Sequence, residues 1–466
     1  MGNQELDIYR KINEFENKSD LFKYCFKNTG IPMWLFIRTF LVFKAVRADE
    51  PHTHSKKNVN VKNRLFDEVI KENPFLELHK DIVYAFWTYE ILKIDVDGHS
   101  NDTTIMPFMQ ENLRKSVALM NGKISDGIKL KREYPSLKSD FFFRNYLKKS
   151  TVPQEDVVSI KSIIHYIEMR FPWKIDNQIK KTMHEILMGC SKYLDILIKR
   201  FSLYLGIIRP KLVIVSCANY IDLYGAALII ACKKRKIVTA EIQHAWIGKK
   251  HLQYYFSDYI ISDPKCRMVF PDYLLTMGKY WNQQIKVPEK LYTVGCKKTI
   301  IRNVVQKDSI LFAASTDHER YFLFLSAFLS NPVSEGVTVY FRQHPMWKNT
   351  VKYASLNKYS NFIFADERDL DYYMSICKYV IADGSTVCYE ALYAKKIVFC
   401  FKGPTTDLFD ISSFSDVKLF EDLYDFLRLW MDREGYIPQR HEDLFELDYK
   451  NRYRRFMNMC GCRLKQ

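Results

Sequence analysis

The sequence lacks the signatures of several common enzyme classes. It contains no G-x-x-x-x-G-K-[ST] loop, no G-x-G-x-x-G at a strand–helix turn and no G-x-S-x-G elbow. The first absence excludes a P-loop nucleotidase, and the other two argue against a Rossmann dehydrogenase and an α/β hydrolase. The chemistry must therefore be sought in less common motifs.

A membrane-spanning segment is also missing from the sequence. The longest apolar run, residues 30–46 (GIPMWLFIRTFLVFKAV), carries Arg38 and is shorter than the ~20 apolar residues that a span needs. We predict a buried core helix here. The alternative is a helix in the membrane interface, with Trp34 immersed and Arg38 reaching the headgroups.

Cysteine is present, but in no recognisable frame. The 11 cysteines follow no metal or disulfide spacing, and the C-x-C of Cys460 and Cys462 has no His/Cys set around it. The first residues, MGNQELDIYRK, lack the regions of a signal peptide. We expect free thiols, no bound metal or cofactor, and a location in the cytoplasm or on the inner face of the membrane.

Positive charge is in excess. Lys and Arg number 70 against 54 Asp and Glu, a formal net charge of +16. This balance favours anionic partners such as nucleotides and phospholipid headgroups, although a solvated basic surface without a specific partner is equally consistent. The apolar fraction of 47% is that of an ordinary globular protein with a sizeable core.

Strands and helices alternate in the carboxyl-terminal half. Strand patterns at residues 212–216, 237–243 and 259–262 form a first unit. Before this unit, residues 1–150 mix amphipathic helices with one strand-like run at 82–87, and residues 157–204 have the pattern of long helices. A second unit has strand patterns at 309–314, 337–342, 361–365, 379–382 and 397–401. Such alternation predicts α/β domains with parallel sheets, in which ligands bind beyond the carboxyl ends of the strands.

Two motifs follow strands of the second unit. Arg342, His344 and Pro345 end one strand, where the guanidinium and imidazole suit a phosphate and the proline stops the strand. Gly384 and Ser385 come after a later strand, at the expected start of a helix. Its free amides and dipole form an anion site, although a helix cap alone also explains the pattern.

Thr386 and Glu390 belong to the same helix. Thr386 can cap the helix or bind phosphate, and Glu390, one turn later, can accept hydrogen bonds from a ribose or sugar hydroxyl. A solvated helix face is the alternative for Glu390.

Two further candidates lie in the first unit. His244 follows the strand at 237–243 and can act as general base, although a structural histidine is the more common case at such a position. In Asp95-Val96-Asp97-Gly98, the two carboxylates fit a turn, a Mg²⁺ or Mn²⁺ site, or a base at Asp97.

Residues 212–401 together resemble bacterial GT-B glycosyltransferases of capsule and O-antigen synthesis. EIQHAWIGKKHLQY resembles their "QHG" segment and YLLTMGKYW their "fG..w" segment. RQHP and ADGSTVCYEAL resemble the His-Pro and Ser/Thr motifs of CMP-sugar and CDP-glycerol transferases. This chain departs from the pattern at Ala245, where the family has glycine, and Val96 replaces the first acid of the sialyltransferase acid-acid-Gly motif.

The resemblance implies two Rossmann-like domains facing across a cleft. We expect an acceptor-side domain with helical additions at residues 1–285, a donor domain at 286–420 and a helical tail at 421–466. By the same resemblance, His344, Ser385 and Thr386 bind the donor, and His244 lies near the acceptor or donor.

The expected function is metal-independent transfer of a sugar from a CMP-, CDP- or UDP-linked donor to a surface polysaccharide or lipid-linked glycan. His244 or Asp97 is the expected base. Besides these substrates, an anionic membrane surface is an expected partner, and nucleic acid is not. A CDP-polyol phosphotransferase, a metal-dependent transferase built on Asp95 and Asp97, and a non-enzymatic protein binding RNA or membrane remain alternatives.

Overall fold

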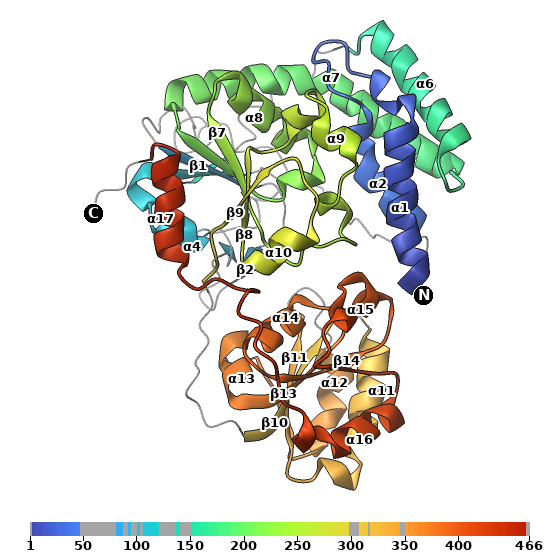
Figure 1. Cartoon of the computed structure of the whole chain (residues 1–466), viewed down its shortest axis with the longest axis vertical. Helices are drawn as coiled ribbons and strands as arrows, with labels where there is room; N and C mark the ends of the chain where they lie inside the picture. The colour runs from blue at the N-terminus through green and yellow to red at the C-terminus, as the bar shows by residue number, and fades with distance from the viewer. Residues whose placement is uncertain are drawn as a thin grey trace.

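The structure is a computed structural model of the whole chain. It describes residues 2–46, 81–86, 92–94, 100–102, 106–120, 136–138, 151–297, 307–315, 317–344, 350–366 and 368–462. Two α/β domains are stacked along the long axis of the molecule (Figure 1). Each is built on its own parallel sheet, which confirms the predicted fold class.

The first domain contains a parallel sheet of seven strands. Their order is β5-β4-β1-β6-β7-β8-β9, so the chain first builds outward from β1 and then continues on the other side. The strands are β1 (Ile82–Phe86), β4 (Ser116–Met120), β5 (Ser136–Lys138), β6 (Leu212–Val215), β7 (Val238–Ile242), β8 (Tyr273–Thr276) and β9 (Lys290–Thr293). An antiparallel pair, β2 (Leu92–Ile94) and β3 (Ser100–Asp102), lies apart from this sheet.

The second domain repeats this winding with six strands in the order β12-β11-β10-β13-β14-β15. This is the doubly wound order of nucleotide-binding folds, with its topological switch between β10 and β13. The strands are β10 (Lys307–Ala314), β11 (Thr338–Gln343), β12 (Phe362–Phe364), β13 (Cys377–Ala382), β14 (Ile397–Phe401) and β15 (Val417–Phe420).

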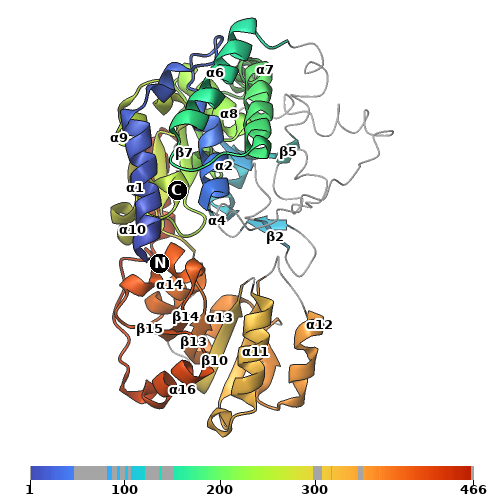
Figure 2. The ribbon, with the colours of Figure 1, turned by 90° about the vertical axis from the view of Figure 1, so that its right-hand side faces the viewer.

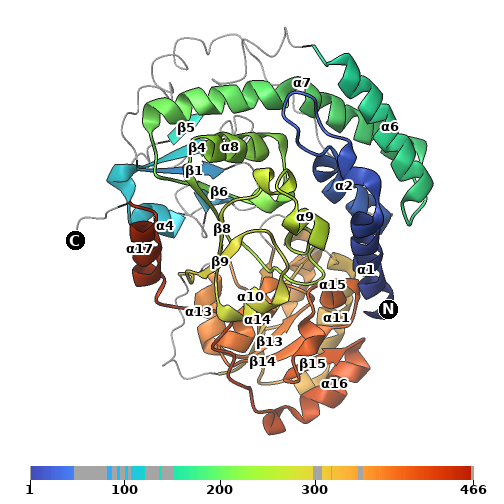
Figure 3. The same cartoon turned by 45° about the horizontal axis from the view of Figure 1, so that its top comes forward.

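Helices cover both faces of each sheet. In the first domain, α7 (Asn177–Ile208) and α8 (Leu223–Lys234) pack on one face, and α4 (Met106–Gln110) and α17 (Tyr449–Met459) on the other. Alternate residues of β1 divide between these layers, Val83 and Ala85 facing one and Ile82 and Tyr84 the other. Figure 3 shows α7 running across the domain.

In the second domain, α11 (His318–Leu329) and α16 (Leu423–Met431) form one layer, and α13 (Leu370–Ile376) and α14 (Thr386–Tyr393) the other. The shorter helices of the chain are α9 (Asp258–Ser262), α10 (Lys279–Gln284), α12 (Thr350–Tyr353) and α15 (Pro404–Leu408).

Helices α1 (Gly2–Lys18), α2 (Trp34–Val46) and α6 (Gln154–Arg170) lie beside the first domain (Figures 1 and 2). Trp34 and Arg38 of α2 are buried, which confirms the core helix and contradicts the interfacial alternative. Arg38 pairs with the buried Glu16 and donates to the carbonyls of Leu252 and Tyr255. A buried charge persists because it is paired and hydrogen-bonded in this way.

One expected strand is wrong. Residues 259–262 lie in helix α9, because the Ser257 side chain accepts a hydrogen bond from the amide of Ile260 and caps a helical turn. The run has only four residues, two of them β-branched, too few to distinguish a strand from a short helix. No helix among the described residues is long and apolar enough to cross a membrane.

After α16 the chain returns from the second domain to the first. The returning segment 443–446 pairs with the loops after β8 and β9: Tyr280 donates to Asp443, Trp281 Nε1 to Leu444, and Glu446 to Met277. Helix α17 then packs on the first sheet. The expected boundary at residue 285 therefore needs a correction, because β9 lies beyond it and belongs to the first sheet. The expected tail at residues 421–466 is likewise divided, with α16 in the second domain and α17 in the first.

Two glycines make this return path possible. A Cβ at Gly278 would lie 2.3 Å from the carbonyl oxygens of Asp443 and Leu444, and one at Gly295 2.3 Å from that of Glu446. Gly295 also has φ +87°, which favours glycine. Gly278 and Trp281 belong to the YLLTMGKYW segment, so in this chain that segment receives the returning strand.

We predict that Gly278→Ala destabilises the protein by about 1–3 kcal/mol or more, because the new methyl group meets backbone atoms that cannot move independently. Gly189→Ala is the control, since a Cβ at Gly189 of α7 meets nothing within 4 Å. That change should stabilise helix α7 by up to about 1 kcal/mol. Urea unfolding measures both, and equal stabilities for the two variants would contradict the packing described here.

Candidate functional site

The carboxyl ends of the two sheets face each other across the domain boundary. The loop after β7 carries Trp246, whose ring stacks on Phe409 in the loop after β14, with centroids 4.8 Å apart. Lys250 Nζ donates to the carbonyl of Asp407 at 2.6 Å. Because both loops follow the carboxyl ends of their strands, the ligand-binding edges of both domains meet here. Two doubly wound domains arranged in this way constitute a GT-B-like fold.

The loop of Trp246 and Lys250 is held from the first-domain side as well. The ring of His251 stacks on Trp246, with centroids 5.0 Å apart, and Tyr9 of α1 donates to the carbonyl of Lys250. Trp246 thus contacts one ring from each domain and joins the two carboxyl edges.

On the second-domain edge, the turn after β13 leads directly into α14. Ser385 caps the helix, its Oγ accepting from the amide of Val387 at 3.3 Å. Gly384 is buried, whereas Ser385 and Thr386 are partly exposed. The amide of Cys388 also donates to the carbonyl of Ser385, so Ser385 accepts from two of the first amides of α14. The turn presents the positive dipole end of the helix. It lies directly after β13, beside the topological switch.

A buried carboxyl lies in the same turn. Tyr321 of α11 donates its hydroxyl to Oδ2 of Asp383, while Oδ1 of Asp383 has no hydrogen-bond partner among the described residues. Burial raises the pKa of Asp383 from 3.8 to about 6, against the opposing effect of the Tyr321 hydrogen bond. A buried carboxyl group with a raised pKa is energetically unfavourable, and such groups are common at functional sites. The turn is therefore a functional-site candidate.

Arg342 and His344 lie at the end of β11, on the same edge of the sheet. Arg342 stands level with Ala313 of β10, which in turn pairs with Ala382 of β13. One strand therefore separates Arg342 from the Asp383–Ser385 turn, about 10 Å at the usual strand spacing. Arg342 Nη1 donates to the carbonyls of Ala365 and Arg368, so it supports the loop after β12. His344 is exposed.

On the first-domain edge, the two residues of the Gln-His pair have different surroundings. The Gln243 side chain accepts from the amide of Met277 at 2.8 Å and donates to the carbonyl of Ala245 at 2.9 Å. It thus joins the ends of β7 and β8. His244 lies within 3.7 Å of the Cys217 sulfur, and burial lowers its pKa to about 4. Its imidazole is therefore neutral at physiological pH.

Glu241 of β7 connects these first-domain loops through hydrogen bonds. Its fully buried carboxyl group accepts from the Tyr254 hydroxyl and from the amide of Asn219 at 2.9 Å. Burial raises the pKa of Glu241 to about 8. The hydrogen bonds connect β7 to the loop after β6, which carries Cys217, and to the loop after Trp246.

The remaining predicted site residues are dispersed. Glu390 lies on α14, one turn beyond Thr386, and is partly exposed. Asp97 and Pro345 lie outside the described residues, as does Asp95. In the part of the chain that the structure describes, no group of three or more His, Cys, Asp or Glu side chains is arranged to hold a metal ion.

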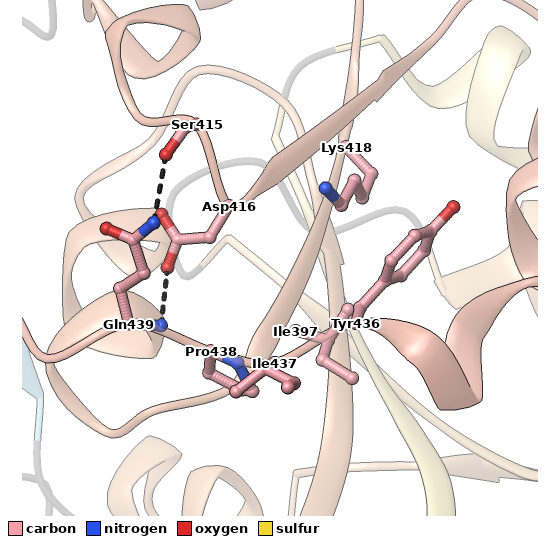
Figure 4. Close-up of a pocket in the computed structure, with 8 residues that line it drawn as sticks. All are labelled: Ile397, Ser415, Asp416, Lys418, Tyr436, Ile437, Pro438 and Gln439. Carbon is pink, nitrogen blue, oxygen red and sulfur yellow. Dashed lines mark hydrogen bonds between the residues drawn. The ribbon is translucent and has the colours of Figure 1, made fainter.

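The pocket in Figure 4 is separate from all of these residues. Ile397, the first residue of β14, and Asp416 and Lys418, at the start of β15, line it, so it lies at the amino ends of the strands. Its polar groups already bond one another. The backbone amide of Gln439 donates to the Asp416 carboxylate at 3.1 Å, and the side-chain Nε2 of Gln439 donates to the Ser415 hydroxyl at 3.2 Å. This pocket is at the wrong end of the sheet for the expected ligand.

The comparisons with known proteins find fold similarity alone. No family model matches the chain, and no curated protein is similar in sequence. Among solved structures, the UDP-GlcNAc 2-epimerase from Methanocaldococcus jannaschii has a TM-score of 0.46 at 10% identity, covering 81% of this chain and 99% of its own. That from Neisseria meningitidis bound to UDP-GlcNAc has 0.42 at 14%, covering 81% and 98%.

CalG4, the calicheamicin glycosyltransferase, is similar to the same degree, with a TM-score of 0.44 at 9% identity, covering 82% of this chain and 94% of its own. These values are too low to carry an argument about activity, which must come from the site itself.

We predict that Asp383→Asn makes the protein more stable at neutral pH. The folded state binds the Asp383 proton more tightly than the unfolded state, so this stabilisation is complete below about pH 4 and is lost as pH rises to about 6. Asparagine has no proton to lose. Relative to pH 4, the variant should gain up to about 3 kcal/mol over the wild type by pH 7. Urea unfolding between pH 4 and 8 measures this, and a pH-independent difference would contradict it.

Proposed function

We propose that this protein is a glycosyltransferase that moves a sugar from a CMP-, CDP- or UDP-linked donor to a surface polysaccharide or lipid-linked glycan, as in capsule or O-antigen synthesis. The observation that supports it best is the Asp383–Ser385 turn. This anion-binding helix start lies at the switch point of the second sheet and faces the carboxyl edge of the first.

The donor phosphate would bind at the start of α14. Gly384 leaves room for close approach, the helix amides donate to the phosphate, and the hydroxyls of Ser385 and Thr386 add two neutral donors. His344 and Arg342 extend the site from β11, and Pro345 is assigned to the same site. Fixed donors directed at the departing phosphate stabilise the charge that develops there, which is usually the largest catalytic contribution.

The sugar and the acceptor would lie toward the first domain. Glu390, one turn into α14, accepts hydrogen bonds from a hydroxyl of the ribose or sugar. His244 or Asp97 removes the proton of the acceptor hydroxyl. At His244 the neutral imidazole is already in the accepting form, although a pKa near 4 makes it a weak base that depends on close alignment. The step requires no metal in this proposal.

The remaining assignments are part of the same proposal. The first domain forms the acceptor side, the second domain binds the donor, and the enzyme works in the cytoplasm or on the inner face of the membrane. Product analysis by mass spectrometry distinguishes glycosyl transfer from CDP-polyol phosphotransfer. Binding of RNA with a steep salt dependence and no turnover would instead indicate a non-enzymatic protein.

We predict that Ser385→Gly weakens nucleotide binding by about tenfold or more, because it removes a phosphate donor and leaves the backbone amides in place. Glycine is tolerated at helix caps at a cost of a few tenths of a kcal/mol. Thermal shift with CMP, CDP, UDP and GDP measures binding, since a ligand that binds the folded state raises Tm.

We further predict that His344→Ala lowers turnover by about a hundredfold, because it removes a donor to the charge that develops on the departing phosphate. Steady-state kinetics measures this change.

Ser257→Gly is the matched control, because Ser257 caps α9 in the first domain in the same way. It should leave the nucleotide-induced shift unchanged. Equal loss of that shift in both cap variants, or wild-type turnover in the His344 variant, would contradict the assignment of the donor site.

We also predict that His244→Asn lowers kcat by at least about a hundredfold, with nucleotide binding unchanged, if His244 is the base. Because the pKa of His244 is about 4, its protonation should not reduce the wild-type rate between pH 5 and 8. Steady-state kinetics across this range checks both points. A fully active His244→Asn enzyme would exclude His244 and leave Asp97 as the proposed base.

A further inference from the structure

Five basic residues gather at one corner of the first domain. Arg209 ends α7, Lys234, Arg235 and Lys236 end α8, and Lys211 precedes β6. We call this set the basic corner. It includes most of the sequence run Lys233–Lys236, which the proposed function does not use.

The packing of the two helices brings these residues together. The guanidinium of Arg235 lies against Gly206 of α7, where an added Cβ would be 2.6 Å from Nη2. The amide of Val238 donates to the carbonyl of Lys211 at 3.3 Å, joining the segments before β6 and β7. The basic corner is therefore one continuous surface at the amino edge of the first sheet.

The charge of this surface is poorly neutralised. Asp81 pairs with Lys211 and Lys115, and Asp272 lies 3.9 Å from the neighbouring Lys233. Within the described residues, Arg209, Lys234, Arg235 and Lys236 have no acidic partner within 4.0 Å. All four are exposed.

The end of α8 allows a test substitution that does not disturb the backbone. Helix α8 ends in a Schellman motif, with Ile237 donating to the carbonyl of Cys232 and Lys236 to that of Lys233. Lys236 occupies the left-handed position of this motif, with φ +56°. Glycine is the favoured residue in that conformation, so Lys236→Gly removes the charge and keeps the helix end.

We propose that the basic corner docks the protein on the anionic phospholipid surface of a membrane. Flexible, exposed lysines on an open surface suit a diffuse layer of negative headgroups. Leu203, 59% exposed and one turn before Gly206 on α7, supplies an apolar side chain that can enter the interface. Phe201 and Tyr204 in the same turn are buried and offer no stacking surface for nucleic-acid bases.

Docking in this orientation leaves the proposed site accessible. The basic corner lies at the amino edge of the first sheet, whereas His244 and the second domain lie at its carboxyl edge. The membrane and the substrates thus approach opposite ends of the first domain. This inference does not depend on the proposed glycosyl transfer.

The test is co-sedimentation of the full chain with vesicles containing phosphatidylglycerol, compared with phosphatidylcholine vesicles. Lys236→Gly should reduce binding about fivefold, the effect of one basic residue near an anionic surface, while Tm stays the same or rises. Binding should disappear in high salt. The control is Lys395→Gly, since Lys395 has φ +56° in the same motif at the end of α14, in the other domain.

A reduction of binding by about fivefold in the Lys236 variant but not in the Lys395 variant, with both proteins stable, supports the proposal. An equal effect of both changes would show that only net charge matters and would overturn it. So would equal binding to neutral vesicles, no binding to anionic vesicles at low salt, or a preference for RNA over vesicles that Lys236→Gly removes.

Discussion

One contact holds the carboxyl edges of the two sheets against one another, and the position of the proposed site depends on it. Trp246 stacks on both His251 and Phe409, and Lys250 bonds to the backbone of the opposite domain. Within the first domain, the returning segment packs on Gly278 and Gly295, where no side chain fits. Parallel sheets bind ligands beyond their carboxyl ends, so these contacts place both binding edges at one boundary.

The proposed site binds negative charge mainly through neutral groups. The hydroxyls of Ser385 and Thr386 and the start of α14 lie at the proposed phosphate position, and His244 is uncharged. Asp383, with a pKa of about 6, is mostly ionised at neutral pH. Arg342, which is proposed to extend the site, already bonds to backbone carbonyls through Nη1. Such a site favours a ligand whose charge is spread over several oxygens and is released after transfer, because fixed dipoles need no rearrangement.

The excess positive charge of the chain is displayed elsewhere. The basic corner occupies the amino edge of the first domain, at the ends of α7 and α8, far along the strands from His244. The basic corner, proposed to bind a membrane surface, is therefore separate from the start of α14, proposed to bind the substrate. The overall composition, which gives only a sum, does not reveal this separation.

The sequence predicted the second sheet well, because β10, β13 and β14 contain buried apolar runs and β11 alternates buried and partly exposed residues. It missed β15 and β5, which are short and polar in part, and it misread α9. The Ser385 cap could be predicted from local spacing. The Tyr321–Asp383 pair and the role of Glu241 could not, since their partners are 62 and 13 residues away and meet only through packing.

The most direct test is a crystal structure of the protein with its nucleotide bound. Phosphate oxygens should lie within hydrogen-bond distance of the amides that open α14 and of the Ser385 hydroxyl, with the sugar directed toward His244. A nucleotide bound at the amino edge of either sheet, or one that leaves the Asp383–Ser385 turn uncontacted, would contradict the proposed site.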